Sequence, residues 1–244
     1  MDRLNGVLIL AARTARSRAY LQTMSAAGLA ADLLIYGPPA AEQVTAATPR
    51  ADRPRLGDLL LPDVDRPLAA SAEGPGWQID QIDDSDLRAP AILAAIAARA
   101  PRLLVFSGYP AQLVPGQLIA RWPVLHVHGG ALPDYRGSTT IYYSLLNDRR
   151  PAVTALLVDG EIDTGSVVDR KTYPMPLAGV DIDYIYDSAL RADLLAHCLR
   201  HWQQHGCLPP AQPQSGDGRS YYVIHPLLKR LALLGRHADS GEAA

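Results

Sequence analysis

Cysteine is scarce in this chain, and the scarcity narrows its chemistry. The two cysteines among the 244 residues, Cys198 and Cys207, have a spacing that fits neither a zinc knuckle nor a CxxC redox pair. Cysteine-poor chains without a recognisable signal peptide are typical of the reducing cytoplasm. We therefore expect a cytoplasmic protein whose thiols are buried or idle.

An excess of charge of one sign is also lacking. The formal net charge is −2 at pH 7 and the pI is near 6.4, so no basic surface attracts nucleic acid. The apolar run at residues 7–12 is much shorter than the roughly 20 residues that span a membrane. We expect neither a nucleic-acid partner nor a membrane, and we interpret the run as a buried first strand.

Phosphate-binding signatures are missing from the turn after this strand. The turn reads AARTARSR and contains neither GxGxxG nor GxxxxGK[ST]. Its arginines, Arg13, Arg16 and Arg18, have two interpretations. They meet an anion near the N-terminus of the following helix, or they are solvated surface residues.

What is present is enough apolar material for a core, 48% of the chain, arranged in alternating strand and helix patterns. The pattern predicts a doubly wound α/β fold with a mostly parallel sheet. Residues 38–76 form a long irregular excursion with a short helix near residues 40–47. The expected strands are 6–11, 31–36, 77–82 (an edge strand), 103–107, 124–128, 153–158, 166–172 and 221–224. The expected helices are 17–27, 86–98 (capped by Ser85), 115–120, 140–146, 182–204 and 226–234.

The chain divides into two parts in this interpretation. Residues 1–175 form the catalytic α/β domain, and residues 176–244 form a helical C-terminal extension packed on it. The tail after Arg236 is expected to be disordered.

Two histidines, His126 and His128, stand at the end of an expected buried strand. Ligands of open α/β sheets bind beyond the carboxyl ends of the strands, and alternation points both side chains to one face. The pair is half of a metal site, a general acid/base pair, or a structural polar cluster. Zinc needs a third ligand, for which Asp159 or Asp163 are candidates. No HExxH supports that option, so we expect no metal.

A longer pattern surrounds the histidines and carries a family resemblance. The chain reads HVHGGALPDYRG from His126 to Gly137, then Ala152-Val-Thr154, then Asp163-Thr-Gly165. It resembles the folate-dependent formyltransferases that act on glycinamide ribonucleotide, methionyl-tRNA or amino sugars. That family has Asn-x-His-Pro-Ser, Leu-Leu-Pro-x-Tyr-Arg-Gly and a closing Asp-x-Gly. The match is good over residues 103–172.

The resemblance implies a Rossmann-like catalytic domain and named roles. His128 matches the histidine that stabilises the oxyanion of the tetrahedral intermediate, and Asp163 matches the aspartate that helps to remove the amine proton. The donor implied is 10-formyltetrahydrofolate, with the pterin in a pocket lined by Phe106, Gly108, Tyr109 and Leu113. An attacking amine develops negative charge on oxygen and positive charge on nitrogen, which an imidazole and a carboxylate can serve.

Departures from the family pattern fall inside the same stretch. His126 stands where the family has Asn, and it adds a group that titrates near neutral pH. Gly129 and Gly130 replace Pro-Ser, which loosens the loop or admits a bulkier ligand. The other residues expected around the substrate are Arg136, Ser138, Thr139 and Tyr142. Arg136 also has a structural interpretation as a brace of the loop, and residues 138–140 as a helix cap.

We therefore expect an enzyme that formylates the amine of a small molecule, an amino sugar or a specialised metabolite. The first alternative is a hydrolase that uses His128 and Asp163 with water. The second is a binding protein on a catalytically retired fold. The oligomeric state is open, with a homodimer as the candidate.

Overall fold

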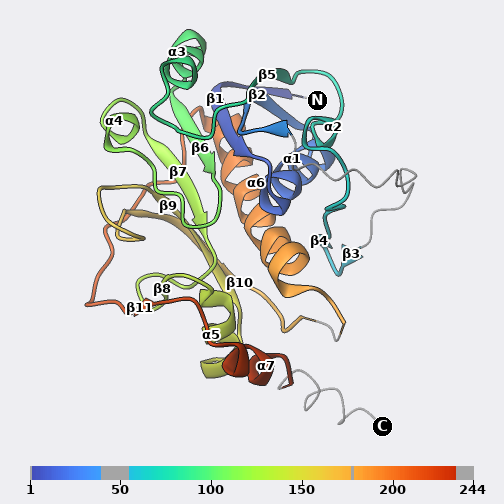
Figure 1. The fold of residues 1–244 in the computed structure, drawn as a ribbon, viewed down its shortest axis with the longest axis vertical. Helices are drawn as coiled ribbons and strands as arrows, with labels where there is room; N and C mark the ends of the chain where they lie inside the picture. The colour runs from blue at the N-terminus through green and yellow to red at the C-terminus, as the bar shows by residue number, and fades with distance from the viewer. Residues whose placement is uncertain (1, 40–54, 177–178, 235–244) are drawn as a thin grey trace.

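The computed structural model describes residues 2–39, 55–176 and 179–234 (Figure 1). The short helix expected near residues 40–47 and the tail after Arg236 lie outside these ranges. Within the described part of the chain, seven strands form one sheet in the order β10-β9-β7-β6-β1-β2-β5. Strands β7, β6, β1, β2 and β5 run parallel to one another. Strand β9 is antiparallel to β7, and β10 is antiparallel to β9. The predicted doubly wound, mostly parallel α/β fold is confirmed.

The strands of this sheet have the following bounds. They are β1 (Asp2–Ala12), β2 (Leu29–Tyr36), β5 (Gln78–Ile82), β6 (Leu103–Ser107), β7 (Val124–His128), β9 (Ala152–Leu157) and β10 (Val167–Thr172). Two short ladders add β3 (Arg55–Leu56) with β4 (Leu59–Leu60), and β8 (Arg136–Gly137) with β11 (Ser220–Tyr221). The edge position predicted for residues 77–82 is confirmed by β5. The strand predicted at 221–224 is shorter, because only Ser220 and Tyr221 pair with β8.

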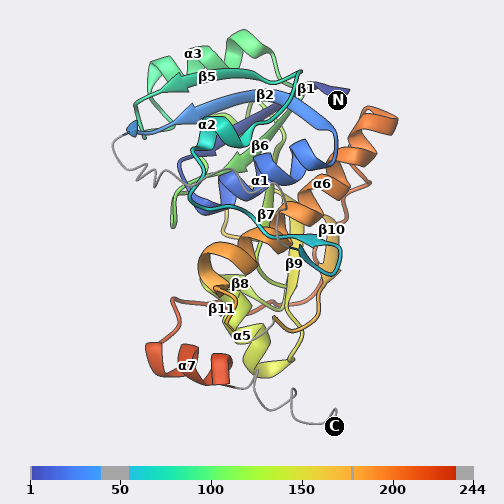
Figure 2. The ribbon, with the colours of Figure 1, turned by 90° about the vertical axis from the view of Figure 1, so that its right-hand side faces the viewer.

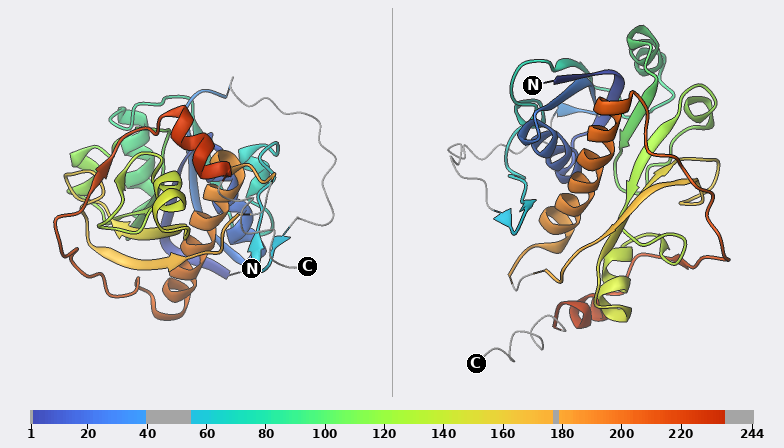
Figure 3. Two further views of the ribbon diagram at one scale, coloured as in Figure 1. Left: turned by 90° about the horizontal axis from the view of Figure 1, so that it is seen from below. Right: turned by 180° about the vertical axis from the view of Figure 1, so that it is seen from behind.

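Helices lie on both faces of the sheet. They are α1 (Ala15–Ala26), α2 (Leu68–Ser71), α3 (Pro90–Arg99), α4 (Gly116–Ile119), α5 (Thr140–Asn147), α6 (Asp187–His205) and α7 (Pro226–Leu234). A π-helical turn, η2 (Ile182–Tyr186), leads into α6. Figures 1 and 3 show α1 and α6 together on one side of the sheet, away from α3 and α4.

One helix start was wrong in the sequence prediction. The helix expected from residue 86 with Ser85 as its cap begins at Pro90, with Ala89 in the N-cap position. Proline fits the first turn of a helix, where its missing N–H is not needed. Proline also disfavours helical geometry in the residue before it, so residues 86–89 lie outside helix α3.

Alternate residues of the central strands fill two hydrophobic clusters, one on each face of the sheet. On β1, Ile9 belongs to the cluster with α1 and α6, and Leu10 belongs to the cluster with α3 and α4. Because both faces are covered, these strands are continuously apolar in sequence.

Helix α6 contributes a long buried stripe to the first of these clusters. One member is Cys198, whose thiol pKa is raised to about 12 by burial, so it stays protonated. The other cysteine, Cys207, is exposed. Helix α6, the long helix of the predicted C-terminal extension, therefore lies directly on the sheet. No helix in the described ranges has the length and apolarity needed to cross a bilayer.

Candidate active site at the carboxyl end of β7

The two histidines lie at the carboxyl end of β7, next to the carboxyl end of β6. On β7, Leu125 and Val127 belong to the hydrophobic cluster of α1 and α6, whereas Val124 faces the opposite cluster. Alternation along a strand places His126 and His128 on the Val124 side. Both therefore project from one face at the sheet edge where α/β proteins bind ligands.

His128 is 4% exposed and is held at both ring nitrogens. Its Nε2 lies 2.6 Å from the carbonyl oxygen of Tyr135 and 3.3 Å from Oγ1 of Thr140. A carbonyl can only accept, so Nε2 donates. The Nδ1 atom lies 3.3 Å from Oδ2 of Asp163. A hydrogen bond here needs a second proton, shared between the imidazole and the carboxylate.

The pKa of His128 reflects this conflict. Burial lowers the pKa below its ordinary value, and the nearby Asp163 carboxylate raises it in partial compensation. The resemblance assigns His128 to the oxyanion, and in this geometry Nε2 has to leave the Tyr135 carbonyl before it can donate there.

Asp163 is fixed in the β9–β10 turn by neighbours that are distant in sequence. Its backbone has φ of +56°, a left-handed conformation that Asp adopts more readily than most residues. Oδ2 accepts the backbone N–H of Gly137 at 2.9 Å, and its carbonyl accepts from the side chain of Gln214 at 2.8 Å. The carboxylate is thus presented to His128.

His126 differs from His128 in having an uncommitted ring nitrogen. Its Nδ1 lies 3.4 Å from the carbonyl oxygen of Phe106, which selects the tautomer with the proton on Nδ1. Its Nε2 makes no hydrogen bond within the described ranges and carries a lone pair. Burial, followed by the charges of Arg16 and Arg191, holds the pKa of His126 well below its ordinary value. The neutral ring therefore presents an acceptor, whereas an asparagine amide there would also offer N–H donors.

Gly129 and Gly130 are small for a reason the sequence did not reveal. A Cβ on Gly129 would lie 2.4 Å from Nη2 of Arg191, and a Cβ on Gly130 would lie 2.7 Å from the Tyr135 carbonyl oxygen. Protein atoms fill the space beside both residues. The interpretation that these glycines admit a bulkier ligand is therefore wrong, because their size lets Arg191 and Tyr135 approach the backbone.

The loop residues after the glycines bind the C-terminal segment. Arg136 donates to Oε1 of Gln214 at 2.9 and 3.3 Å, so it braces the loop, and the Ser138 N–H donates to the Tyr221 carbonyl at 2.9 Å. Thr139 occupies the N-cap position of α5 with φ of +52° and makes no side-chain cap bond. Its Oγ1 instead accepts from the N–H of Ile224 at 2.9 Å. The capping interpretation of Thr139 is wrong, because the C-terminal segment takes its hydroxyl.

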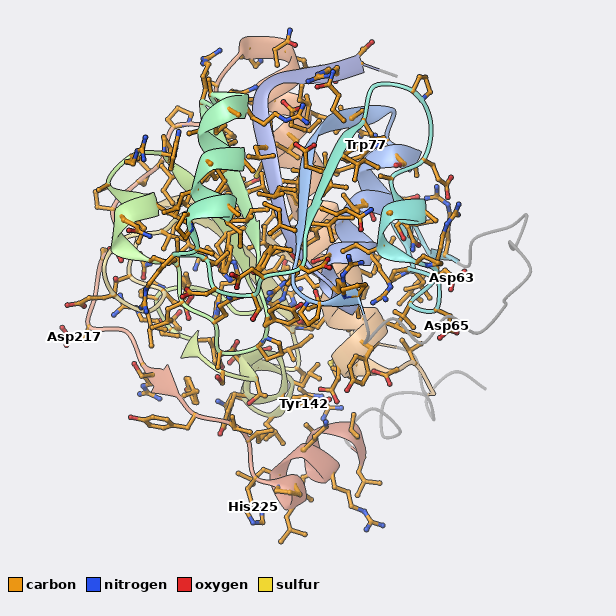
Figure 4. All side chains as sticks on the ribbon, turned by 45° about the horizontal axis from the view of Figure 1, so that its top comes forward. Asp63, Asp65, Trp77, Tyr142, Asp217 and His225 are labelled. Atoms are coloured by element: carbon orange, nitrogen blue, oxygen red, sulfur yellow. The ribbon has the colours of Figure 1, made fainter. Side chains whose placement is uncertain are left out.

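Tyr142 is 1% exposed and lies on α5, above the red ribbon of the C-terminal helix α7 (Figure 4). Its hydroxyl donates to Oδ1 of Asp183 at 2.8 Å, and Lys229 lies 4.9 Å from its ring centroid. Burial and the Asp183 carboxylate raise the pKa of its phenol. Tyr142 thus anchors α5, and its place as a substrate contact stays a prediction.

The residues predicted to line a cofactor pocket differ in how far they are exposed. Phe106 is 4% exposed and its ring centroid lies 6.1 Å from that of His126. Gly108 leaves room for the Phe106 ring, which a Cβ would meet at 2.2 Å. Tyr109 packs edge-on against Tyr36 at 5.8 Å. Leu113 is 66% exposed and supplies open apolar surface on the same loop.

Three polar residues of the site went unrecognised in the sequence. Thr140 is 2% exposed and donates to the Gly129 carbonyl at 2.7 Å, beside His128. Arg191 donates through Nη1 to the Val127 carbonyl at 3.0 Å and pairs with Asp187 at 2.8 Å. The sequence did contain a signal for Asp187 and Arg191. They are an acidic and a basic residue four positions apart in the first turns of the long helix α6, a spacing that favours an ion pair.

The arginines of the turn after β1 are not solvated surface residues. Arg16 donates to the Gly108 carbonyl at 2.5 Å, and burial lowers the pKa of its guanidinium. Arg13 donates to the Gly37 carbonyl and Arg18 to the Arg66 carbonyl. That interpretation is wrong because the folded chain surrounds this turn.

No group of three or more His, Cys, Asp or Glu residues in the described ranges is arranged to hold a metal ion. What the geometry offers is an unprotonated imidazole nitrogen, a buried His–Asp pair and two guanidinium groups around one sheet edge. Such a set can move protons and stabilise developing negative charge.

Comparisons with known proteins agree with this geometry. Residues 57–191 match the family model described as formyl transferase. The chain is 31% identical over 195 residues to the methionyl-tRNA formyltransferase of Pelobacter propionicus, covering 78% of this chain and 57% of that protein. A second methionyl-tRNA formyltransferase, from Trichlorobacter lovleyi, is also 31% identical, over 78% of this chain and 58% of that protein. The chain thus spans less than two thirds of the length of these relatives.

Solved structures share the fold at low sequence identity. A 4-N formyltransferase from Francisella tularensis aligns with a TM-score of 0.59 at 12% identity, over 96% of this chain and 88% of that one. A sugar N-formyltransferase from Shewanella sp FDAARGOS_354 aligns with a TM-score of 0.55 at 15% identity, over 94% and 87%. With the family model matching more than half of its length, the chain belongs to the formyl transferase family.

Proposed function

We propose that this protein transfers a formyl group from 10-formyltetrahydrofolate to the amine of a small molecule, an amino sugar or a specialised metabolite. The observation that carries the proposal is the cluster of His126, His128 and Asp163 at the carboxyl end of β7, in a chain of the formyl transferase family. The family resemblance implies an amine acceptor. The cluster supplies groups that can accept and return the proton that an attacking amine loses.

His126 is the general base in this proposal. Its Nε2 carries a lone pair because Nδ1 donates to the Phe106 carbonyl. As the amine nitrogen bonds to the formyl carbon, that nitrogen loses a proton, which His126 Nε2 accepts. When the bond to the donor's nitrogen breaks, His126 returns the same proton to that leaving nitrogen. His126 therefore ends the reaction in the protonation state in which it began.

His128 and Asp163 form the buried half of the site. Nε2 already donates to Tyr135, and the Asp163 carboxylate lies 3.3 Å from Nδ1. A proton taken up between Nδ1 and Asp163 during the reaction gives the imidazole positive character, which the carboxylate favours against the burial that lowers the pKa of His128. Positive charge fixed beside the reacting group stabilises the negative charge that develops on the formyl oxygen. Asp163 keeps that charge in place and holds the Gly137 backbone with it.

The loop after β6 fits a planar apolar group such as a pterin. Tyr109 and Val114 are partly buried beside the exposed Leu113, so apolar surface is available next to His126. Gln112 closes the loop on itself, since its side chain accepts from the Tyr109 N–H at 3.0 Å. Of the residues on this side, Phe106 is the one that lies beside His126, so a donor that also covers Phe106 brings its formyl group to the end of β7.

A hydrolase is the second candidate, and the tautomer of His126 favours it. A lone pair on Nε2 can take a proton from water as readily as from an amine. Formate and the free folate would then form without any acceptor. The two functions differ in whether donor turnover depends on an amine.

Incubation of the purified chain with 10-formyltetrahydrofolate tests both. Tetrahydrofolate release is followed with and without a panel of amines, and products are identified by mass spectrometry. Turnover that requires an amine and yields an N-formyl product supports the transferase. Turnover without an amine shows a hydrolase, and the absence of both turnover and folate binding removes folate from the proposal.

Asp163→Asn supplies the matched variant. General acid–base groups contribute typically 10²–10⁴-fold, so we expect kcat/KM to fall by at least about a hundredfold. Glu161→Gln makes the same carboxylate-to-amide change at an exposed position of the same turn and should keep wild-type rates. If Asp163→Asn were as active as wild type, the pair would have no part in catalysis. If His128→Asn also left every detectable activity unchanged, the alternative of a binding protein would gain support.

A further inference from the structure

Two buried polar atoms without a hydrogen-bond partner lie in one place. Across residues 2–39, 55–176 and 179–234, the Tyr20 hydroxyl and Asp187 Oδ1 are buried side-chain atoms with neither a hydrogen bond nor an ion-pair partner, whereas the buried Arg191 Nε meets Asp187 Oδ2 at 2.8 Å. Buried polar groups in native proteins are nearly always paired, and each unpaired one costs about 1–3 kcal/mol. Two such atoms in one cluster indicate a place where a ligand supplies the partners.

The cluster consists of Arg16, Tyr20, Asp187 and Arg191. The first two residues lie on α1 and the last two on α6, the neighbouring helix on the same face. Tyr20 is fully buried, and the side chains of Arg191 and Asp187 are 15% and 16% exposed. The cluster is therefore largely enclosed by the fold, with only a small part of the Arg191 and Asp187 side chains reaching solvent.

The two guanidinium groups are anchored at the carboxyl ends of adjacent strands. Arg16 donates to the carbonyl of Gly108 after β6, and Arg191 donates to the carbonyl of Val127 on β7. Val127 lies between the two histidines in the chain. Gly129, directly after His128, comes so close to Arg191 that a Cβ would meet Nη2 at 2.4 Å. The cluster thus borders the proposed active site.

One positive charge in the cluster has no counter-charge. Two guanidinium groups face one carboxylate, Asp187, and the other carboxylate nearby, Asp163, is engaged by His128 and by the Gly137 N–H. Donor atoms remain open too, since Nη1 of Arg16 and Nη2 of Arg191 make no hydrogen bond within the described part of the chain. One unbalanced positive charge with convergent N–H and O–H donors fits a singly charged carboxylate.

We propose that the acceptor amine is an amino carboxylate whose carboxylate is bound by Arg16, Arg191 and the Tyr20 hydroxyl. This rests on the proposed formyl transfer and names the class of its acceptor. The carboxylate lies against the α1–α6 side of β7, and the amine of the same small molecule reaches Nε2 of His126. Asp187 Oδ1 accepts an N–H or O–H of the ligand.

Binding of such an acceptor also activates the base. Arg16 and Arg191 both lower the pKa of His126. A bound carboxylate neutralises part of that field, so the pKa of His126 rises and Nε2 becomes a stronger base when the acceptor is in place. An amine without the carboxylate meets a weaker base.

Acetate is the probe for the binding step, which needs no folate. Thermal unfolding of the full chain is followed while sodium acetate is titrated at constant ionic strength against sodium chloride. We expect a saturable rise in Tm with acetate and none with chloride. Tyr20→Phe removes the unpaired hydroxyl and little else, and it should weaken acetate binding about tenfold, as for a lost hydrogen bond to a charged group.

Arg99→Gln is the matched control for Arg16→Gln. Arg99 is also partly buried and paired, with Asp80 and Asp32, but it lies at the end of α3 outside the cluster. Arg16→Gln should lose the acetate effect and Arg99→Gln should keep it. A merely structural Tyr20 predicts that Tyr20→Phe is equally or more stable and responds to acetate like wild type. That result, or a wild-type response to acetate no greater than to chloride, overturns the proposal.

A second assay separates this inference from the proposed function. Amino acids are compared with their carboxamides as acceptors in the formyl transfer assay. We expect kcat/KM at least about tenfold higher for the carboxylate, with the difference abolished in Arg16→Gln. Equal transfer to both members of each pair rejects the carboxylate site and leaves formyl transfer standing. No transfer to any amine, with acetate binding intact, rejects the proposed transferase and leaves the anion site.

Discussion

His126 and His128 have different chemical capacities although they are two residues apart on one strand. His128 donates from Nε2 to Tyr135 and meets Asp163 at Nδ1, so the fold occupies both nitrogens. His126 uses only Nδ1, on the carbonyl of Phe106. The residue that departs from the family pattern is thus the one whose nitrogen is available to a substrate.

His126→Asn tests this assignment. Asparagine cannot accept a proton at neutral pH, so we expect kcat/KM to fall by about 10²-fold or more. Wild-type activity should fall on acidification only below pH 6.5, because the pKa of His126 lies well below that value, and this limb should vanish in the variant. The measurement is kcat/KM from pH 4.5 to 8.5.

The control for this variant is His197→Asn, the same change at an exposed ion pair with Asp169. It should leave the pH profile unchanged. Full activity of His126→Asn, with the acid limb retained, would contradict a base at this position and leave the amine proton to Asp163, to which the family resemblance assigns it.

At the scale of elements, one side chain joins the three segments of the site. Gln214 donates from Nε2 to the carbonyls of Asp163 and Gly165, both at 2.8 Å, and accepts from Arg136. It therefore ties the C-terminal segment to the β9–β10 turn and to the loop that follows β7. No local pattern in the sequence around Gln214 indicates this function.

Gln214→Ala should loosen the site more than the fold. Gln214 makes four hydrogen bonds, two of them from Arg136 to one oxygen. At about 1 kcal/mol each, their loss gives an expected decrease of about 3–4 kcal/mol in the free energy of unfolding, measured by urea titration. Hydrogen exchange at the Gly137 amide, which donates to Asp163, should accelerate as well. Gln203→Ala removes an exposed hydrogen bond to Asp2 and should change neither. If hydrogen exchange at the Gly137 amide were as slow in Gln214→Ala as in the wild type, the β9–β10 turn would be ordered without Gln214.

The elements themselves were largely predictable, because apolar runs and helical periods are local signals. The strand at 124–128 and the helix at 226–234 agree with β7 and α7 to the residue. Errors arose where a distant segment competes for a local group. Thr139 gives its hydroxyl to Ile224 instead of capping α5, and no local pattern records that choice.

The site was predictable in part for the same reason. His128 and Asp163 could be singled out because both belong to a family motif with fixed spacing. The approach of Arg191 to Gly129 did not, because it depends on α6 lying against α1 across the end of β7. The i, i+4 spacing of Asp187 and Arg191 predicts an ion pair, but not that Arg16 lies beside it.

At the scale of the whole molecule, the chain returns to its own active site. After α6 it runs back along the antiparallel edge, where Gln212 bridges to Val167, and then pairs β11 with β8. The described part of the chain closes with α7, which lies beside α5 (Figure 2). The segment after α6 thus covers the outer side of the catalytic loop, so stability of the fold and order of the site are linked.

The buried histidines make that stability dependent on pH. The pKa of His126 is lowered well below its ordinary value of 6.5, chiefly by burial, and that of His128 is lowered too. In the unfolded chain both regain the ordinary value, so below about pH 6.5 the unfolded state binds more protons than the native state. Stability is therefore fully present above pH 6.5 and falls with pH below it, with a limiting slope of about 1.4 kcal/mol per pH unit for each histidine.

Urea unfolding at pH 7.5 and pH 5.5 measures this loss. We expect the wild type to lose about 1 kcal/mol per lowered histidine between these values, beyond what its carboxylates contribute. His126→Asn removes one of the two titrating groups, so its loss should be smaller by about 1 kcal/mol. Equal losses in His126→Asn and wild type would mean that His126 is protonated as easily in the fold as in water. A neutral base at the end of β7 would then have no support.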